Sequence, residues 1–208
     1  MRKQFIAGCF LALIHSPFSF AFSESSQTSL THSHLNGVSI YEELRRKYFV
    51  TELYTSVPVH SITQLHEQGG EVQLEIKFLR EMPTNKFSQL WVRGAVINNS
   101  DALIIQEKAN LDAFAGTFTN SFKAGDSVVL HFDGETNMSI FYNKRLLATY
   151  ASLDLMGVLL NAVAGDVPLS SSFKRELFAG GQVDRELKAI TQQLQLKAAS
   201  GDLSVAQN

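Results

Sequence analysis

A strict alternation of apolar and polar residues between Gly69-Gly70 and Pro83 constrains the fold more than any other stretch. Apolar side chains stand at every second position, Val72, Leu74, Ile76 and Phe78, and Gln73, Glu75 and Lys77 separate them. Successive side chains of a strand point to opposite faces, so the pattern predicts a strand with one buried and one solvated face. Such strands are typical of an antiparallel sheet covered on a single side.

Residues 35–54 open the folded part of the chain and precede this strand. Aromatic and β-branched residues are dense from Leu44 to Tyr54, which predicts a strand buried on both faces. Asn36-Gly37 is a turn signal, and the cations Arg45, Arg46 and Lys47 stand at the entrance of the strand. We expect this stretch to line a small-molecule site, if the protein has one.

The remaining chain predicts helices and strands in turn. A helix follows Pro83 and ends at Asn98-Asn99-Ser100, and a second helix has Asp101 as its N-cap. Three strands follow at Ser127–Phe132, 138–142 and 145–150, with a turn at Asn143-Lys144. Helices are predicted at 153–164, 170–178 and, as an amphipathic segment, 182–199. This order predicts an α+β fold with the helices gathered on one face of the sheet.

Composition bounds the class of protein. The chain has 208 residues, 45% of them hydrophobic, and a formal net charge of -2. That length and apolar content suit a single domain with a real core. No run of Lys or Arg exceeds three residues, so we do not expect nucleic acid as a partner.

The amino terminus has the pattern of a secretory signal peptide at residues 1–23. Arg2 and Lys3 precede an apolar stretch at 5–14, and Ser19-Phe20-Ala21 is a small-x-small cleavage site. The apolar stretch is too short to span a bilayer, so no stable membrane anchor is expected after cleavage. Residues 24–34 then form a flexible Ser- and Thr-rich leader. We expect the mature protein in the periplasm or secreted.

Few residues suit metal or redox chemistry. The single cysteine, Cys9, lies inside the signal peptide, so the mature chain would have no thiol. His32 and His34 stand two apart in the leader without a third ligand, and the other histidines are isolated. We therefore expect no metal site and no cofactor.

Three segments in order resemble the chalcone isomerase family, specifically its bacterial exported branch. They are LNGVSIYEELRRKYFVTELY, then VQLEIKFLREMPTNKFSQLWVRGAV, then the stretch from KAGDSVVLHF to the closing GDVP and LFAG. The resemblance covers residues 35–180, which we take as the domain. Residues 181–208 remain as a carboxy-terminal amphipathic helix and tail. The resemblance implies an open-faced sandwich: a large antiparallel sheet, helices packed on one face, and an apolar cleft between them.

The resemblance also tests for catalysis. The family's isomerases close a ring with an Arg, a Thr, a Tyr, an Asn and a late hydroxyl residue, which hold a phenolate and stabilise a developing enolate. In this chain those positions fall on Tyr41, Phe49, Phe87, Gly94 and Met156. Every replacement removes charge or hydrogen bonding, so we expect no catalytic residues and no efficient isomerase activity.

The same replacements suggest an apolar binding cleft. The residues expected to line it are Tyr41, Phe49, Phe87, Trp91, Gly94 and Met156. The resemblance implies an apolar ligand such as a fatty acid, because some non-catalytic relatives bind fatty acids. A carboxylate would want a cation, and the sequence leaves open whether Arg45, Arg46, Arg80 or Arg93 reaches the cleft.

Two alternatives remain open from the sequence. In the first, the cleft is filled by its own side chains, and the protein is a scaffold that meets a protein partner through residues 182–199. In the second, the protein keeps residual isomerase activity, as an intramolecular lyase.

Overall fold

The computed structural model describes residues 34–200, without the side chains of residues 198 and 199. The predicted signal peptide, the predicted leader up to residue 33 and the last eight residues lie outside this range. Among the described helices, none is long and apolar enough to cross a membrane.

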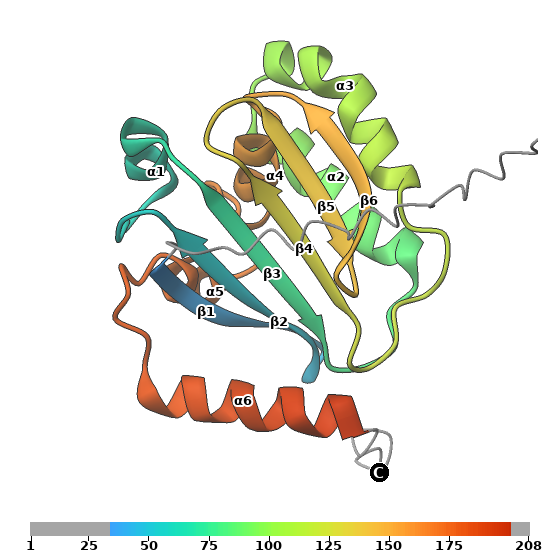
Figure 1. The fold of residues 1–208 in the computed structure, drawn as a ribbon, viewed down its shortest axis with the longest axis vertical. Helices are drawn as coiled ribbons and strands as arrows, with labels where there is room; N and C mark the ends of the chain where they lie inside the picture. The colour runs from blue at the N-terminus through green and yellow to red at the C-terminus, as the bar shows by residue number, and fades with distance from the viewer. Residues whose placement is uncertain (1–33, 201–208) are drawn as a thin grey trace, which may run out of the picture. The chain divides into compact units, whose positions relative to one another are not determined.

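One antiparallel sheet organises the described chain (Figure 1). Its strands lie side by side in chain order, so each is hydrogen-bonded to the strand before and after it. This confirms the antiparallel sheet predicted from the alternating pattern and the large sheet that the family resemblance implies. The strands are β1 (His34–Glu43), β2 (Arg46–Thr55), β3 (Val72–Phe78), β4 (Ser127–Phe132), β5 (Asn137–Tyr142) and β6 (Arg145–Ala151).

Helices connect and cover these strands, which confirms the α+β open-faced class. Figure 1 shows α2 and α4 behind the sheet, and α2 packs against both α3 and α4. The two predicted helices after Pro83 are present, although Ser100 and not Asp101 is the N-cap of the second. The helices are α1 (Ile62–Gln68), α2 (Thr84–Asn98), α3 (Asp101–Gly116), α4 (Leu155–Ala164), α5 (Ser171–Leu177) and α6 (Arg185–Ser200).

The strand register aligns apolar side chains on the face that the helices cover. Leu53 of β2 pairs with Leu74 of β3, Leu74 pairs with Leu130 of β4, and Leu130 pairs with Ile140 of β5. All four side chains are fully buried. Removing such a row from water is the main favourable term in folding a sheet of this kind.

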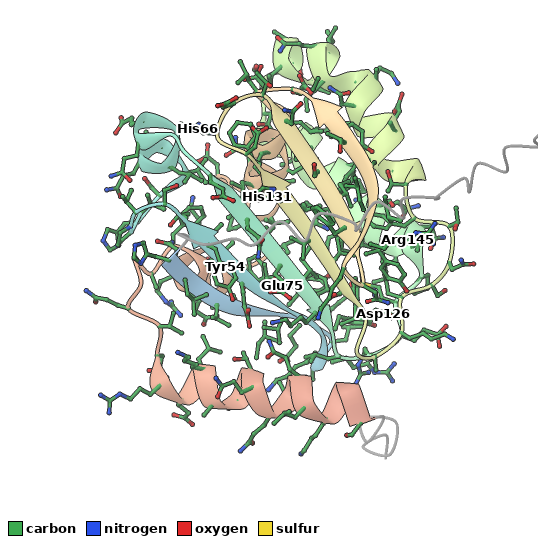
Figure 2. All side chains as sticks on the ribbon, in the orientation of Figure 1. Tyr54, His66, Glu75, Asp126, His131 and Arg145 are labelled. Carbon is green, nitrogen blue, oxygen red and sulfur yellow. The ribbon has the colours of Figure 1, made fainter. Side chains whose placement is uncertain are left out.

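The opposite face carries α6, the amphipathic helix predicted at the carboxy terminus. Leu194 packs there with Val38 and Val50, and the Gln195 amide donates a hydrogen bond to Glu52 at 2.7 Å. Figure 2 shows Tyr54 and Glu75 on this face, turned away from α2 and α4. The Tyr54 hydroxyl also donates to the Glu52 carboxylate. Leu194 of the apolar side of α6 therefore packs on the domain itself.

The first stretch is a hairpin and not one buried strand. Leu44 and Arg45 form its two-residue turn with φ values of 49° and 63°, and β1 pairs with β2 on either side. Leu44 is 90% exposed, so its predicted place in a buried strand was wrong. The turn carries neither Gly nor Asn, which are the usual signals at such positions. The Asn143-Lys144 turn, in contrast, is confirmed with φ values of 48° and 68°.

Asn36 and Gly37 lie inside β1, so the predicted turn at this point was also wrong. The buried Asn36 amide donates to the Leu177 carbonyl at 3.0 Å and accepts from the Val59 backbone N–H at 2.8 Å. A Cβ on residue 37 would lie 2.1 Å from that Leu177 carbonyl, so only Gly allows α5 to approach β1 this closely. These two residues fasten the end of α5 and the loop before α1 to the edge strand.

The sequence did not predict α1, because seven residues are too few to show a helical period. Its N-cap, Ser61, accepts a hydrogen bond from the Gln64 backbone N–H. The fourth helix begins at Leu155, two residues later than predicted.

Replacing Asn36 with Ala should destabilise the fold. The substitution leaves a buried carbonyl and a buried N–H without partners, which costs about 2–4 kcal/mol in free energy of unfolding. Urea unfolding followed by circular dichroism measures this. Asn120→Ala, at an exposed position, should stay within about 0.5 kcal/mol of the parent. Equal stabilities for the two variants would contradict the fastening role of Asn36.

Candidate functional site

Four of the six predicted cleft residues form a continuous row of rings. Tyr41 stacks on Phe49 with ring centroids 4.9 Å apart, Phe49 meets Phe87 at 6.3 Å, and Phe87 meets Trp91 at 5.7 Å. Further rings extend this aromatic layer between the sheet, α2 and the segment after α3: Phe78, Phe114, Phe118 and Phe122. None of these eight side chains is more than 8% exposed. At this part of the helix–sheet interface, the predicted cleft is filled by its own side chains.

Gly94 and Met156 lie apart from the aromatic layer. A Cβ on residue 94 would lie 2.1 Å from the Ala162 carbonyl, so Gly94 is the point where α2 and α4 cross closely. Its role is therefore in packing. Met156 is in the first turn of α4 and is 3% exposed. Of the six predicted residues, only Met156 lines either of the two cavities described below.

The arginines considered from the sequence do not enter the aromatic layer. Arg45, Arg46 and Arg93 are exposed. Arg80 donates from Nε to the Lys47 carbonyl at 3.0 Å and lies over the Tyr48 ring.

A cation that sequence reasoning missed lies at the edge of the layer. The Lys86 ammonium sits 4.2 Å from the centroid of the Tyr48 ring and forms an ion pair with Glu43. Its position directly before Phe87 was the only signal in the sequence. Burial raises the pKa of Tyr41 nearby, and the Glu43 carboxylate raises it further, so the Tyr41 phenol stays protonated at neutral pH. A paired lysine beside a neutral phenol is not the bare guanidinium that the isomerase chemistry uses.

Two polar atoms are buried on this side of the sheet without a partner in the described chain. They are the Thr51 hydroxyl on β2 and the Trp91 indole N–H on α2, each on a side chain about 1% exposed. A buried donor without an acceptor is costly. The interface is therefore apolar in its contacts but retains hydrogen-bonding capacity.

A cavity of about 360 Å³ lies where α1, α3 and α4 meet the ends of β3 and β4. We refer to it as the α1–α4 cavity. Ligand pockets in proteins commonly start near this volume. Its apolar lining is formed by Leu65, Val72, Leu103, Phe132, Leu153, Met156, Val158 and Leu160.

The α1–α4 cavity has few polar lining residues, and those with a full charge are acidic. Glu135 and Asp154 are exposed at its rim, and no Lys or Arg is among its lining residues. His66 of α1 packs against Gly157, where a Cβ would lie 2.6 Å from the imidazole Nε2. Asn161 is held by a hydrogen bond to Asn99 at 2.9 Å. The cavity therefore combines an apolar interior with an acidic rim.

A second, larger hollow of about 720 Å³ lies where α5 leads into α6 beside β1. Four charged residues border it: Arg175, Glu176, Asp184 and Glu186. None of the six predicted cleft residues lines it. We favour the smaller cavity as the site because its lining is more apolar and it adjoins the helix–sheet core.

Within residues 34–200, no group of three or more His, Cys, Asp or Glu residues is arranged to hold a metal ion. His131 pairs with Glu71 at 2.6 Å on the far side of the sheet from α2. His32 and His34, which were not expected to bind metal, fall partly outside the described residues.

Comparison with solved structures finds the same fold in a fatty-acid binding protein from Arabidopsis thaliana. The TM-score is 0.55 at 12% sequence identity, over 78% of this chain and 91% of that chain. At this identity the likeness concerns the fold. No curated protein sequence matches the chain. A family model described as chalcone isomerase-like matches residues 19–180. The chain therefore belongs to the chalcone isomerase-like family.

Proposed function

We propose that this protein binds an apolar small molecule without catalysing a reaction, and that the α1–α4 cavity holds the ligand. The observation that carries the proposal is this cavity of about 360 Å³ with a mostly apolar lining beside Met156. The similar fold of a protein described as a fatty-acid binding protein supports fatty acids as the first class to test.

The site differs from the one expected from the sequence. Tyr41, Phe49, Phe87 and Trp91 form a packed layer, and opening it would expose rings that now bury one another. Burying an aromatic side chain contributes several kcal/mol, so a preformed cavity is the cheaper place for a ligand. Met156 connects the two regions, because it belongs to the same buried core as the aromatic layer.

The rim of the cavity favours an uncharged head group. Glu135 and Asp154 would repel a carboxylate, and the lining offers no Lys or Arg to pair with it. His66 and Asn161 can form hydrogen bonds with a hydroxyl or an ester carbonyl. A long-chain alcohol should therefore bind more tightly than the fatty acid of equal chain length.

Titration of the purified protein with such an alcohol and the matching acid tests the site. Leu103→Trp would fill the cavity from α3 and should lower the affinity for both by about tenfold or more. Ile105→Trp is the matched control, because Ile105 lies on the same helix, does not line the cavity and is 74% exposed. Equal affinities for the parent and Leu103→Trp would exclude this cavity as the site.

Isomerase activity should be absent. Tyr41 is buried and neutral, and apolar side chains or Gly stand at the other four family positions. Losing a single preorganised donor typically costs a hundredfold or more in rate. We expect a hydroxychalcone to cyclise no faster with the protein than in buffer, followed by absorbance. A rate above buffer that scales with protein concentration would overturn the non-catalytic assignment.

We propose export as part of this function, on the strength of the amino-terminal sequence. The cations at residues 2 and 3, the apolar stretch at 5–14 and the Ser-Phe-Ala site support it. Mass measurement of the protein from its own cells should give a chain that begins near residue 22–24. An intact amino terminus would contradict cleavage.

A scaffold with a protein partner is the second candidate. The filled aromatic layer favours it, because a filled cleft is what a scaffold would show. The packing of Leu194 of α6 on Val38 and Val50 weighs against it, since part of the apolar side of that helix already contacts the domain. Failure of the protein to release any lipid on denaturation, together with failure to bind the alcohol or the acid, would leave the scaffold as the better account.

A further inference from the structure

The charges of this chain are separated between the two ends of the sheet. One end, the turn end, holds the β1–β2 turn, the start of α2, the loop before β4 and the β5–β6 turn. Backbone hydrogen bonds from Gly125 to Phe78 and from Asn143 to Ser127 join the loop before β4 and the β5–β6 turn to neighbouring strand ends, and the Leu79 N–H donates to the Tyr48 carbonyl of β2. The opposite end holds α1, the β4–β5 turn and the start of α4.

Cations outnumber acids at the turn end. Its acids are Glu42, Glu43, Glu81 and Asp126. Its cations are Arg45, Arg46, Lys47, Arg80, Lys86, Lys123, Lys144 and Arg145. At the opposite end the loops and α1 carry Glu67, Glu71, Asp133, Glu135 and Asp154 and no Lys or Arg. In Figure 2 His66 marks the acidic end, and Asp126 marks the basic one.

Most of this positive charge is free to meet a partner. Arg45, Arg46, Lys123, Lys144 and Arg145 are exposed, and none of them forms an ion pair within the described chain. Asp126, in contrast, is occupied by hydrogen bonds from the Tyr142 hydroxyl and the Asn143 amide. The field at this end is therefore positive.

Leu44 projects from the β1–β2 hairpin, at one edge of this end, directly before Arg45 and Arg46. It is 90% exposed at the tip of the hairpin, and its φ of 49° is one that Asn or Gly adopts more easily. Glu43 of β1 and Arg46 of β2 lie opposite each other in the strand register, directly behind the turn. An uncovered leucine in an unfavourable backbone position gains nothing for the folded monomer. Unfavourable positions of this kind persist where a function needs the side chain.

We propose that the turn end docks on an anionic lipid surface, with Leu44 inserted at the boundary of the acyl chains. An exposed leucine followed by Arg45, Arg46 and Lys47 matches the layering of a bilayer, because the cations meet the lipid phosphates at the depth where the leucine enters the apolar region. An acidic protein would satisfy the cations but would also need a pocket for Leu44. The lipid surface accounts for both features, and it does not rest on the ligand proposed above.

Co-sedimentation of the mature protein, which begins near residue 24, with lipid vesicles tests the proposal without the apolar signal segment. Vesicles that contain phosphatidylserine should bind the protein more tightly than pure phosphatidylcholine vesicles, and added salt should weaken the difference. Arg45→Gln with Arg46→Gln should weaken binding to the anionic vesicles by about tenfold. Leu44→Asn should weaken it as well without loss of fold, because Asn suits a positive φ.

The matched control is Arg185→Gln with Lys188→Gln, two exposed cations at the first turn of α6. This control should leave vesicle binding unchanged. Equal binding to both kinds of vesicle would overturn the proposal, as would an equal loss in the control. If Leu44→Asn left vesicle binding unchanged and polyglutamate competed with the vesicles for the protein, the proposed lipid surface would be wrong. An acidic protein would then be the better candidate for the partner.

Discussion

The packing of aromatic rings between the sheet and α2 is the constraint on which the rest of the structure depends. Phe49 and Phe87 belong to different elements, yet each contacts several rings of the same layer. Interiors of this kind pack at crystal-like density and leave little room for other molecules. The aromatic layer therefore fixes α2 on the sheet. The remaining space lies beside α4, where Met156 and Leu160 border the α1–α4 cavity.

The sequence predicted elements whose periodicity is local. The alternation in β3 and the stripe through Phe87 and Trp91 each follow from a repeat that one element carries alone. The prediction from the sequence was wrong where tertiary contacts decide the backbone conformation. Asn36-Gly37 is a common turn sequence, but hydrogen bonds of Asn36 with Leu177 of α5 and with Val59 keep these two residues inside β1. The turn at Leu44-Arg45 contains no Gly or Asn that would have predicted it. The pairing of β1 with β2 imposes the turn.

The candidate site was predictable only in part for the same reason. Periodicity places Phe87 and Trp91 on one face of a helix. The resemblance to the chalcone isomerase family, and not periodicity, pointed to Tyr41 and Phe49 as their neighbours. Whether they enclose space depends on side-chain volumes and on the distance between layers, which no pattern encodes. The α1–α4 cavity needs α1, a helix too short to show a period. Its acidic rim comes from Glu135, in the β4–β5 turn, and Asp154, directly before α4, so two separate loops of the sequence supply it.

The separation of charge links the cavity to the proposed docking surface. The cavity lies at the acidic end of the sheet, and the hairpin tip with Leu44 lies at the basic end. A protein held on an anionic surface by Leu44, Arg45 and Arg46 would therefore present the mouth of the cavity away from the lipid. In the reversed orientation the acidic rim would lie within a Debye length, about 8–10 Å, of the anionic surface and would be repelled. Ligand exchange would then proceed through the solvent and not directly from the bilayer.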